Sequence, residues 1–132
     1  PVGHPLAKLE KVPLSALDQQ TMIMYSPADG PYMYEILMGR LRTESVAPIF
    51  AHYIGHTHSI LSLVGAGLGF ALVPESARRM QFSDVTYRDL ETARELSAEL
   101  HICWSKSTEN PAIAKLIALL HEGRPALPSG NL

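Results

Sequence analysis

The sequence has a single cysteine in 132 residues, Cys103, so it cannot form an internal disulfide. Such sparse use of cysteine is typical of a reducing compartment, and we expect a cytoplasmic location. The chain also lacks an apolar run near the roughly 20 residues needed to span a bilayer, and it has no signal-peptide pattern. It begins with Pro1 rather than methionine, and we expect it to be an excerpt from a longer protein.

An excess of basic residues is missing as well. The 11 Lys and Arg residues stand against 13 Asp and Glu residues, which gives a formal net charge of −2. A free-standing DNA-binding domain normally presents a basic surface to the phosphate backbone. We therefore expect that this chain by itself does not bind duplex DNA specifically.

The motifs of common enzymes are absent: there is no G-x-S-x-G elbow, no phosphate-binding P-loop and no H-E-x-x-H. Gly65, Gly67 and Gly69 resemble a phosphate-binding loop only at first sight. They follow an expected helix and precede an expected strand, whereas a dinucleotide fingerprint lies between a strand and the next helix. We interpret them as a helix end and a tight turn, and we expect neither enzyme activity nor a cofactor.

Three histidines that are close in sequence, His52, His56 and His58, raise the question of a metal site. Known zinc sites need further ligands, and no cysteine or carboxylate cluster lies nearby in the sequence. We interpret these histidines as polar residues around a helix start, where they could face a ligand, and expect no bound metal. Cys103 alternates with buried positions and has no activating base in the sequence, so we interpret it as a core or hinge residue rather than a catalytic thiol.

Apolar residues, by contrast, are plentiful enough for a buried core, since 46% of the residues are hydrophobic and 18% are charged. Short apolar runs bounded by turn residues predict strands that are buried on both faces, as in a parallel sheet. These runs are Thr21–Tyr25, Ile49–Ile54 and residues 70–73. Further strands are expected around residues 85–88 and at residues 99–104.

Apolar residues between these runs recur at helical spacing. They predict helices at residues 32–43, from Thr57 or Ser59 to Gly65, and at 110–121, with short helices at 16–20 and 75–80. Alternating strands and helices imply a doubly wound α/β lobe with a mainly parallel sheet. In such sheets ligands bind beyond the carboxyl ends of the strands, which here means residues 26–33 and 55–59.

Thr57, His58 and Ser59 carry the most informative chemistry, because they lie at an expected helix start. A hydroxyl there can satisfy the free N–H groups of its own helix. The same N–H groups, when left free, form a site for a carboxylate. The sequence alone does not decide between these two interpretations.

The order of segments resembles the effector-binding domain of LysR-type transcriptional regulators. The segment His4-Pro5-Leu6-Ala7 and the LSAL segment at 14–17 are similar to the middle of that domain. Residues 59–75 (SILSLVGAGLGFALVPE) are similar to its most recognisable C-terminal signature, a helix, a glycine turn and a strand that ends in Val-Pro. The segments 87–90 and 100–104 and the closing helix after Asn110-Pro111 also match, so the resemblance extends to about Gly123.

This resemblance implies an incomplete periplasmic-binding-protein-like domain of two α/β lobes. Residues 1–20 would connect from the first lobe, 21–98 would form the second lobe, 99–123 would return a strand and the last helix to the first lobe, and 124–132 would be a tail. An N-terminal winged helix-turn-helix, a linker helix and half of the first lobe would be missing. Operator DNA would be bound only through that missing domain, and the effector domains would associate as dimers or tetramers.

The resemblance also implies an effector in the cleft between the lobes, in this family often an aromatic or carboxylated metabolite. By position, Pro31, Tyr32, Met33 and Thr57 match residues that line the cleft, and we add His58 at the same helix start as Thr57. We expect these five residues to contribute to the binding of a small organic anion.

Two other classes stay open at this point. A periplasmic-type solute-binding protein of a transporter shares the fold but would carry a secretory leader, whereas a small α/β enzyme would need a catalytic pair that we do not find. The residues encoded upstream of Pro1 would distinguish a regulator, with a helix-turn-helix about one domain length earlier, from a transport protein.

Overall fold

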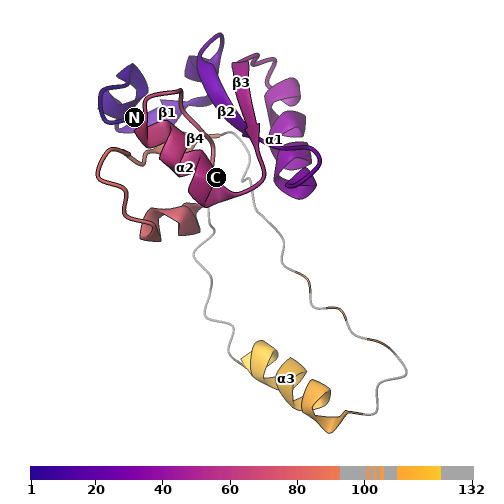
Figure 1. Ribbon diagram of the computed structural model, residues 1–132. Coiled ribbons are helices and arrows are strands. Elements are labelled where there is room, and N and C mark those ends of the chain that lie inside the picture. The colour runs from indigo at the N-terminus through magenta and orange to yellow at the C-terminus, as the bar shows by residue number, and fades with distance from the viewer. Residues whose placement is uncertain (93–100, 102, 104, 106–109, 123–132) are drawn as a thin grey trace.

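The computed structural model describes residues 1–92, 101, 103, 105 and 110–122 (Figure 1). The helices are α1 (Pro31–Thr43), α2 (Thr57–Gly65) and α3 (Pro111–Glu122), and the strands are β1 (Lys11–Pro13), β2 (Thr21–Tyr25), β3 (Ile49–Ile54) and β4 (Asp89–Glu91). Three short 3-10 helices complete the described elements: η1 (Pro5–Lys8), η2 (Leu14–Leu17) and η3 (Glu75–Arg79). No helix among the described residues is long and apolar enough to cross a membrane.

The centre of the fold is the parallel pair β2–β3, which the helix α1 connects. In β2, four consecutive residues from Met22 to Tyr25 are buried. Successive side chains of a strand point to opposite faces, so this pattern requires cover on both faces. Figure 1 shows this cover, with α1 on one side of the two strands and α2 on the other. The pair therefore forms a βαβ unit with a helix on each face.

Two expected strands are confirmed at their expected bounds, Thr21–Tyr25 and Ile49–Ile54. The strand expected at 70–73 is wrong in extent, because only Phe70 forms a bridge, with Met22 of β2. The strand expected at 85–88 is also misplaced. The observed strand is β4, three residues long, which pairs in parallel with β1 from Lys11 to Pro13.

The expected strand at 99–104 lies outside the described residues, apart from His101 and Cys103, which belong to no strand. Of the described helices, α1, α2 and α3 confirm the three longer predictions. The two short helices expected at 16–20 and 75–80 are instead the 3-10 helices η2 and η3. In η2 the buried side chains are Leu14 and Leu17, three residues apart, which is the spacing that a 3-10 turn aligns on one side.

The glycines after α2 have the structural role that the sequence predicted. Gly65 is the last residue of α2, and Gly67 has a φ of 81° that favours glycine. Gly69 has a φ of 143°, and a Cβ atom there would lie 2.6 Å from the carbonyl oxygen of Thr21. The turn therefore needs glycine so that the chain can return closely against β2.

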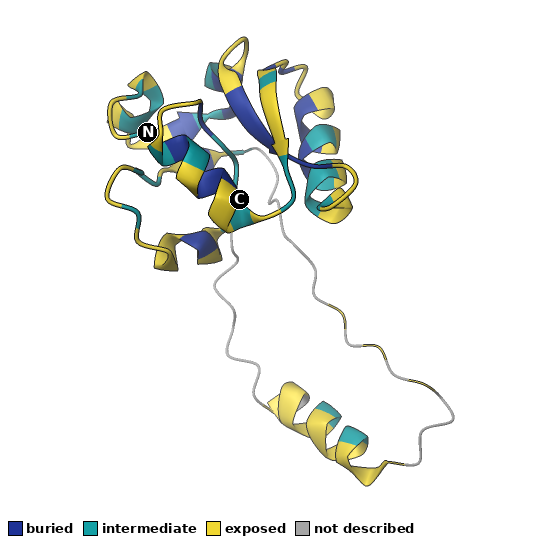
Figure 2. Ribbon diagram, in the orientation of Figure 1, coloured by how far each residue is buried: buried dark blue, intermediate teal, exposed yellow. Residues whose placement is uncertain are grey.

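The core lies between β2 and the two helices that cover it (Figure 2). Its least exposed side chains come from β2, α1 and α2, with η2 closing one end: Leu17, Met22, Ile23, Met24, Leu37, Leu41, Ile60 and Leu61. Burying each such side chain contributes roughly 1.5–3 kcal/mol. These residues fix the positions of the helix starts relative to the strand ends.

In helix α3 much of the apolar side-chain surface is exposed. The helix starts after Asn110, whose side-chain oxygen accepts a hydrogen bond from the Ala112 N–H at 3.0 Å. On this helix Leu116 is 47% exposed and Leu120 is 50% exposed. The helical prediction is confirmed, while the apolar face remains accessible to a partner.

Candidate functional site

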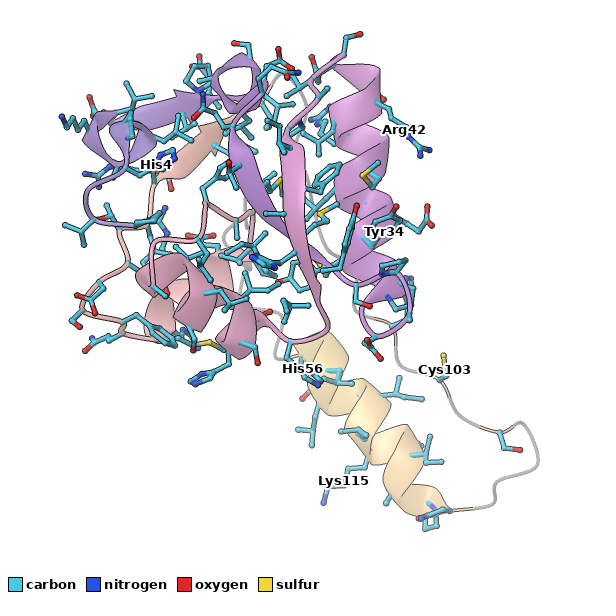
Figure 3. All side chains as sticks on the ribbon, turned by 45° about the horizontal axis from the view of Figure 1, so that its top comes forward. His4, Tyr34, Arg42, His56, Cys103 and Lys115 are labelled. Carbon is cyan, nitrogen blue, oxygen red and sulfur yellow. The ribbon has the colours of Figure 1, made fainter. Side chains whose placement is uncertain are left out.

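The carboxyl ends of β2 and β3 lie side by side, since Tyr25 is aligned with Ile54 in the strand register. The chain then passes through residues 26–30 into α1 and through residues 55–56 into α2. Figure 3 shows His56 at the second of these passages. Both helices therefore begin at the same edge of the sheet, where the sequence placed the candidate site.

The loop after β2 is ordered by Ser26, which is only 8% exposed. Its hydroxyl donates to the carboxylate of Asp29 at 3.0 Å and accepts hydrogen bonds from the backbone N–H groups of Ala28 and Asp29 at 3.2 and 3.3 Å. The backbone N–H of Ser26 donates to the Ile54 carbonyl at 3.0 Å. Hydrogen bonds therefore join residues 26–29 to one another and to the end of β3.

The two loops touch at Gly55. A Cβ atom at this position would lie 2.5 Å from the Cβ of Asp29, closer than real Cβ contacts allow. At Gly30 a Cβ atom would meet the Tyr25 ring at 3.3 Å and the Gly55 carbonyl oxygen at 3.4 Å. The glycines therefore permit a close approach of the two loops, which brings the two helix starts together.

Tyr25 and Thr57 join the two halves of the site directly. Their hydroxyl oxygens lie 2.7 Å apart and share a hydrogen bond. Burial raises the pKa of the Tyr25 phenol above its ordinary value, and the hydrogen bond from Thr57 acts in the opposite direction. Tyr25 is therefore neutral at physiological pH and offers a buried polar end at the edge of the sheet.

The start of α2 has no side-chain cap. His56 occupies the N-cap position without a side-chain hydrogen bond, and Thr57 directs its hydroxyl to Tyr25 rather than to its own helix. Among the described residues, the backbone N–H groups of Thr57, His58 and Ser59 have no hydrogen-bond partner. A helix start carries partial positive charge and free donors, which favour a bound anion.

The start of α1 differs. Its N-cap is Gly30, which has no side chain, and Pro31 in the first turn has no N–H to offer. The carboxylate of Asp29 already supplies negative charge two residues before the helix. The positive partial charge at the α1 start is therefore partly compensated by Asp29, and the α2 start is the more favourable position for an anion.

The five residues predicted from the sequence occupy this edge of the sheet. Pro31 and Tyr32 are exposed, with Tyr32 49% accessible, and Met33 packs partly against the core. Thr57 is half-buried beside Tyr25, and the exposed His58 has its ring 5.1 Å from the ring of Phe82.

Sequence reasoning missed Tyr25, which it treated as a core residue, and it did not single out Asp29. The last residue of a buried strand, when it carries a polar end, is the signal that could have identified Tyr25.

No group of three or more His, Cys, Asp or Glu side chains within the described part of the chain is arranged to hold a metal ion. A cavity is present elsewhere in the fold. It is lined by residues 70–73 and by Thr86, Arg88 and Leu90, and Pro1 and His4 also face it. This cavity is separate in sequence from all five predicted site residues.

The sequence pattern of the LysR substrate binding domain matches residues 1–125. The parallel strands β2 and β3 with helices on both faces agree with the periplasmic-binding-protein-like architecture of such a domain. The chain belongs to the LysR substrate binding domain family, as its segment order indicated.

Similar curated proteins are bacterial transcriptional regulators. They include the uncharacterized HTH-type regulator YnfL of Escherichia coli K12, 28% identical over 87% of this chain, and the HTH-type regulator TtuA of Agrobacterium vitis, 28% identical over 91%. The HTH-type regulator AlsR of Bacillus subtilis is 28% identical over 89% of the chain. The chain spans only 38%, 40% and 38% of these relatives' own lengths. No solved structure matches it significantly.

Proposed function

We propose that this chain is the effector-sensing part of a LysR-type transcriptional regulator, and that a small organic anion bound at the α2 start controls transcription. The observation that carries the proposal is the start of α2, which has no side-chain cap, and whose N–H groups at Thr57, His58 and Ser59 have no partner in the described part of the chain. This start lies beside the Tyr25–Thr57 hydroxyl pair. A solute-binding protein of a transporter would offer the same fold, but the similar proteins are regulators.

In this proposal the ligand's carboxylate approaches the α2 start, while Tyr32 and Met33 supply aromatic and apolar surface from the α1 start. An aromatic or unsaturated acid fits that combination. Each favourable helix-start contact is worth up to about 1 kcal/mol to a nearby anion. The other wall of the cleft would come from the first lobe, with residues 21–98 as the second lobe and 99–123 as the return to the first.

The regulator would act in the cytoplasm as an oligomer and would reach operator DNA through a separate N-terminal domain. A candidate contact surface is the β3–α1 face, which we define as Tyr34, Ile49, Phe50 and Tyr53. Ile49 is 54% and Tyr53 49% exposed, and the rings of Tyr34 and Phe50 lie 6.4 and 6.0 Å from that of Tyr53. Within the described residues, β3 pairs with β2 alone, so its outer edge is open.

The test is the inducer response of the full-length regulator. Thr57→Val should shift the inducer dose–response by about 1–2 kcal/mol, on the order of 5- to 30-fold, with little change in operator affinity. Thr57→Ser keeps the hydroxyl and should keep the response.

Ser62→Ala is a matched control on the same helix, because the Ser62 hydroxyl donates only to the His58 carbonyl on an exposed face. If Thr57→Val lowers the melting temperature but leaves the dose–response where it was, the effector site does not include this hydroxyl and the proposal for the site fails.

A further inference from the structure

The Tyr25 and Thr57 hydroxyls form a pair whose oxygens lie 2.7 Å apart and in which either oxygen could be the donor. Each hydroxyl carries one hydrogen and can also accept through its oxygen. The pair therefore holds two hydrogens, and only one of them can lie between the two oxygens. The other hydrogen is available to a further group, so the direction of this hydrogen bond decides what the pair offers to a ligand.

Burial decides the direction of the hydrogen bond. Tyr25 is 3% exposed, whereas Thr57 is half-buried. Among the described residues, no acceptor other than Thr57 bonds to the Tyr25 hydroxyl. If Thr57 were the donor, the phenolic hydrogen would stay buried without an acceptor, which is costly. A phenol is also more acidic than an aliphatic alcohol and hence the stronger donor, so Tyr25 donates and Thr57 accepts.

The hydrogen of the Thr57 hydroxyl is then left for a group outside the pair. Its own helix start cannot take this hydrogen, because the backbone groups there are N–H donors. The backbone N–H groups of Thr57, His58 and Ser59 also lack a partner in the described part of the chain. These N–H groups and the Thr57 hydroxyl together suit a ligand group that only accepts. A carboxylate only accepts, whereas a carboxamide brings two N–H hydrogens of its own.

We infer that Tyr25 positions the hydrogen of the Thr57 hydroxyl for the effector and thereby makes the α2 start prefer a carboxylate to a carboxamide. The inference rests on the proposed effector site and adds to it a residue that acts on the effector only through Thr57. The strand β2 holds the phenol in place, since its residues from Met22 to Tyr25 are buried. A Cβ atom at Gly30 would meet the Tyr25 ring at 3.3 Å, so the loop also packs closely against this ring. A site residue on a buried strand is held more precisely than one on a loop.

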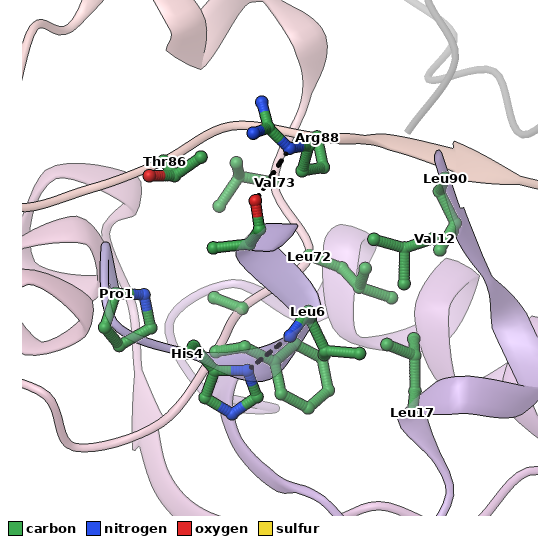
Figure 4. Close-up of a pocket in the computed structure, with 13 residues that line it drawn as sticks. Pro1, His4, Leu6, Val12, Leu17, Leu72, Val73, Thr86, Arg88 and Leu90 are labelled. Carbon is green, nitrogen blue, oxygen red and sulfur yellow. Dashed lines mark hydrogen bonds between the residues drawn. The ribbon is translucent and has the colours of Figure 1, made fainter. Parts of the chain in front are cut away.

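The cavity shown in Figure 4 provides a contrast, because its His4 and Arg88 side chains bond to the backbone of the chain itself. The His4 Nδ1 accepts from the Leu6 N–H at 3.2 Å, and the Arg88 Nε donates to the Ala7 carbonyl at 3.0 Å. Both bonds stabilise the 3-10 helix η1. The hydroxyl pair at the α2 start differs, since its internal hydrogen bond leaves one hydrogen for a ligand.

Two aromatic probes of nearly the same shape test this preference in the full-length protein. 4-Fluorobenzoate and 4-fluorobenzamide differ only in the group that would meet the α2 start, and fluorine NMR titrations measure the dissociation constant of each. We expect the wild type to bind the carboxylate more tightly. Tyr25→Phe should reduce the ratio of the two constants about 5-fold, which corresponds to one net hydrogen bond. A purely structural role of Tyr25 would weaken the binding of both probes alike and leave the ratio unchanged.

Combined variants show whether Tyr25 acts through Thr57. Thr57→Val should reduce the ratio by itself, and adding Tyr25→Phe should reduce it no further. In a Thr57→Ser background, which retains a hydroxyl, Tyr25→Phe should still reduce the ratio. Tyr87→Phe is the matched control, because it removes a phenolic hydrogen bond of 2.8 Å to the Met80 carbonyl and should leave the ratio unchanged.

The possible outcomes separate this inference from the proposed effector site. The inference is overturned if Thr57→Val reduces the ratio but Tyr25→Phe does not, or if the two effects add in the double variant. The proposed effector site would stand in both cases. If Thr57→Val leaves the ratio unchanged, or if neither probe binds the wild type, the effector site at the α2 start fails and the inference fails with it.

Discussion

The hydrogen bond between the Tyr25 and Thr57 hydroxyls should stabilise the folded effector domain, and removal of either hydroxyl should lower its stability. The hydroxyl oxygens lie 2.7 Å apart, and Tyr25 is only 3% exposed, so water does not readily replace a lost partner. A net hydrogen bond is worth about 0.5–1.5 kcal/mol, and an unsatisfied buried partner costs about 1–3 kcal/mol. We expect Thr57→Val and Tyr25→Phe each to lower the free energy of unfolding by about 1–2 kcal/mol.

The double variant Thr57→Val, Tyr25→Phe measures how strongly the two hydroxyls are coupled. If the two hydroxyls hydrogen-bond mainly to each other, removing the second one after the first should lower the free energy of unfolding only a little further. The coupling free energy should then be about 1 kcal/mol. Urea denaturation of the complete effector domain, followed by circular dichroism, supplies the four free energies. Thr43→Val is a suitable control partner for Tyr25→Phe, because the Thr43 hydroxyl donates to the Gly39 carbonyl on the exposed side of α1.

Losses at Tyr25 and Thr57 that simply add, as those of the control pair should, would refute this reasoning. The Thr57 hydroxyl would then have a role independent of Tyr25 in the unliganded protein. Strong coupling together with a shifted inducer response would mean instead that the pair stabilises the fold and orients the hydroxyl that the effector meets.

Three further predictions follow from individual residues. Burial raises the pKa of Tyr25, so the unfolded chain loses this proton at a lower pH than the folded protein does. Stability should therefore be full below the ordinary pKa of 10.0 and fall as the pH rises above it. Tyr25→Phe should make that fall shallower in denaturation series over about pH 9–11, and the part that remains is expected from Tyr87, whose pKa burial also raises. Gly69→Ala should lower the free energy of unfolding by at least about 2 kcal/mol, because its Cβ would lie 2.6 Å from the Thr21 carbonyl oxygen at a φ of 143°. Gly39→Ala, at a mid-helix position where a Cβ meets nothing within 4 Å, should raise it by about 0.5–1 kcal/mol. Thermal unfolding measures both changes. Tyr53→Lys on the β3–α1 face should weaken self-association of the full-length protein in sedimentation experiments, and an unchanged oligomer would exclude this face as the contact.

The elements that could be predicted from the sequence are those whose partners lie nearby along the chain. The strands β2 and β3 and the helices α1 and α2 follow one another within 45 residues, and each carries its own apolar pattern and its own end signals. Pro31 marks the α1 start, and Gly65 to Gly69 mark the α2 end. For these segments, local pattern and tertiary packing favour the same structure.

The errors in strand assignment have a common physical cause. A strand exists only where a neighbour supplies hydrogen bonds, and the neighbour of β4 is β1, which lies more than 70 residues earlier in the chain. The Asp-Leu-Glu sequence of β4 gives no apolar signal of that pairing. Residues 70–73 show the reverse, an apolar run that, among the residues the structure describes, has a bridge at Phe70 and no strand partner beyond it.

The candidate site was predictable as a place but not as a set of contacts. In open parallel sheets ligands bind at the loops that follow the strands, so the sequence could indicate residues 26–33 and 55–59. The charge balance at that edge depends on Asp29, which Gly55 allows to come close to both loops. A carboxylate ligand would be repelled from the side of Asp29, since like charges at short range disfavour each other. In the proposed site an anion would therefore gain most at the backbone N–H groups of Thr57, His58 and Ser59, which have no partner among the described residues. Tyr32 and Met33 would then contact its apolar body.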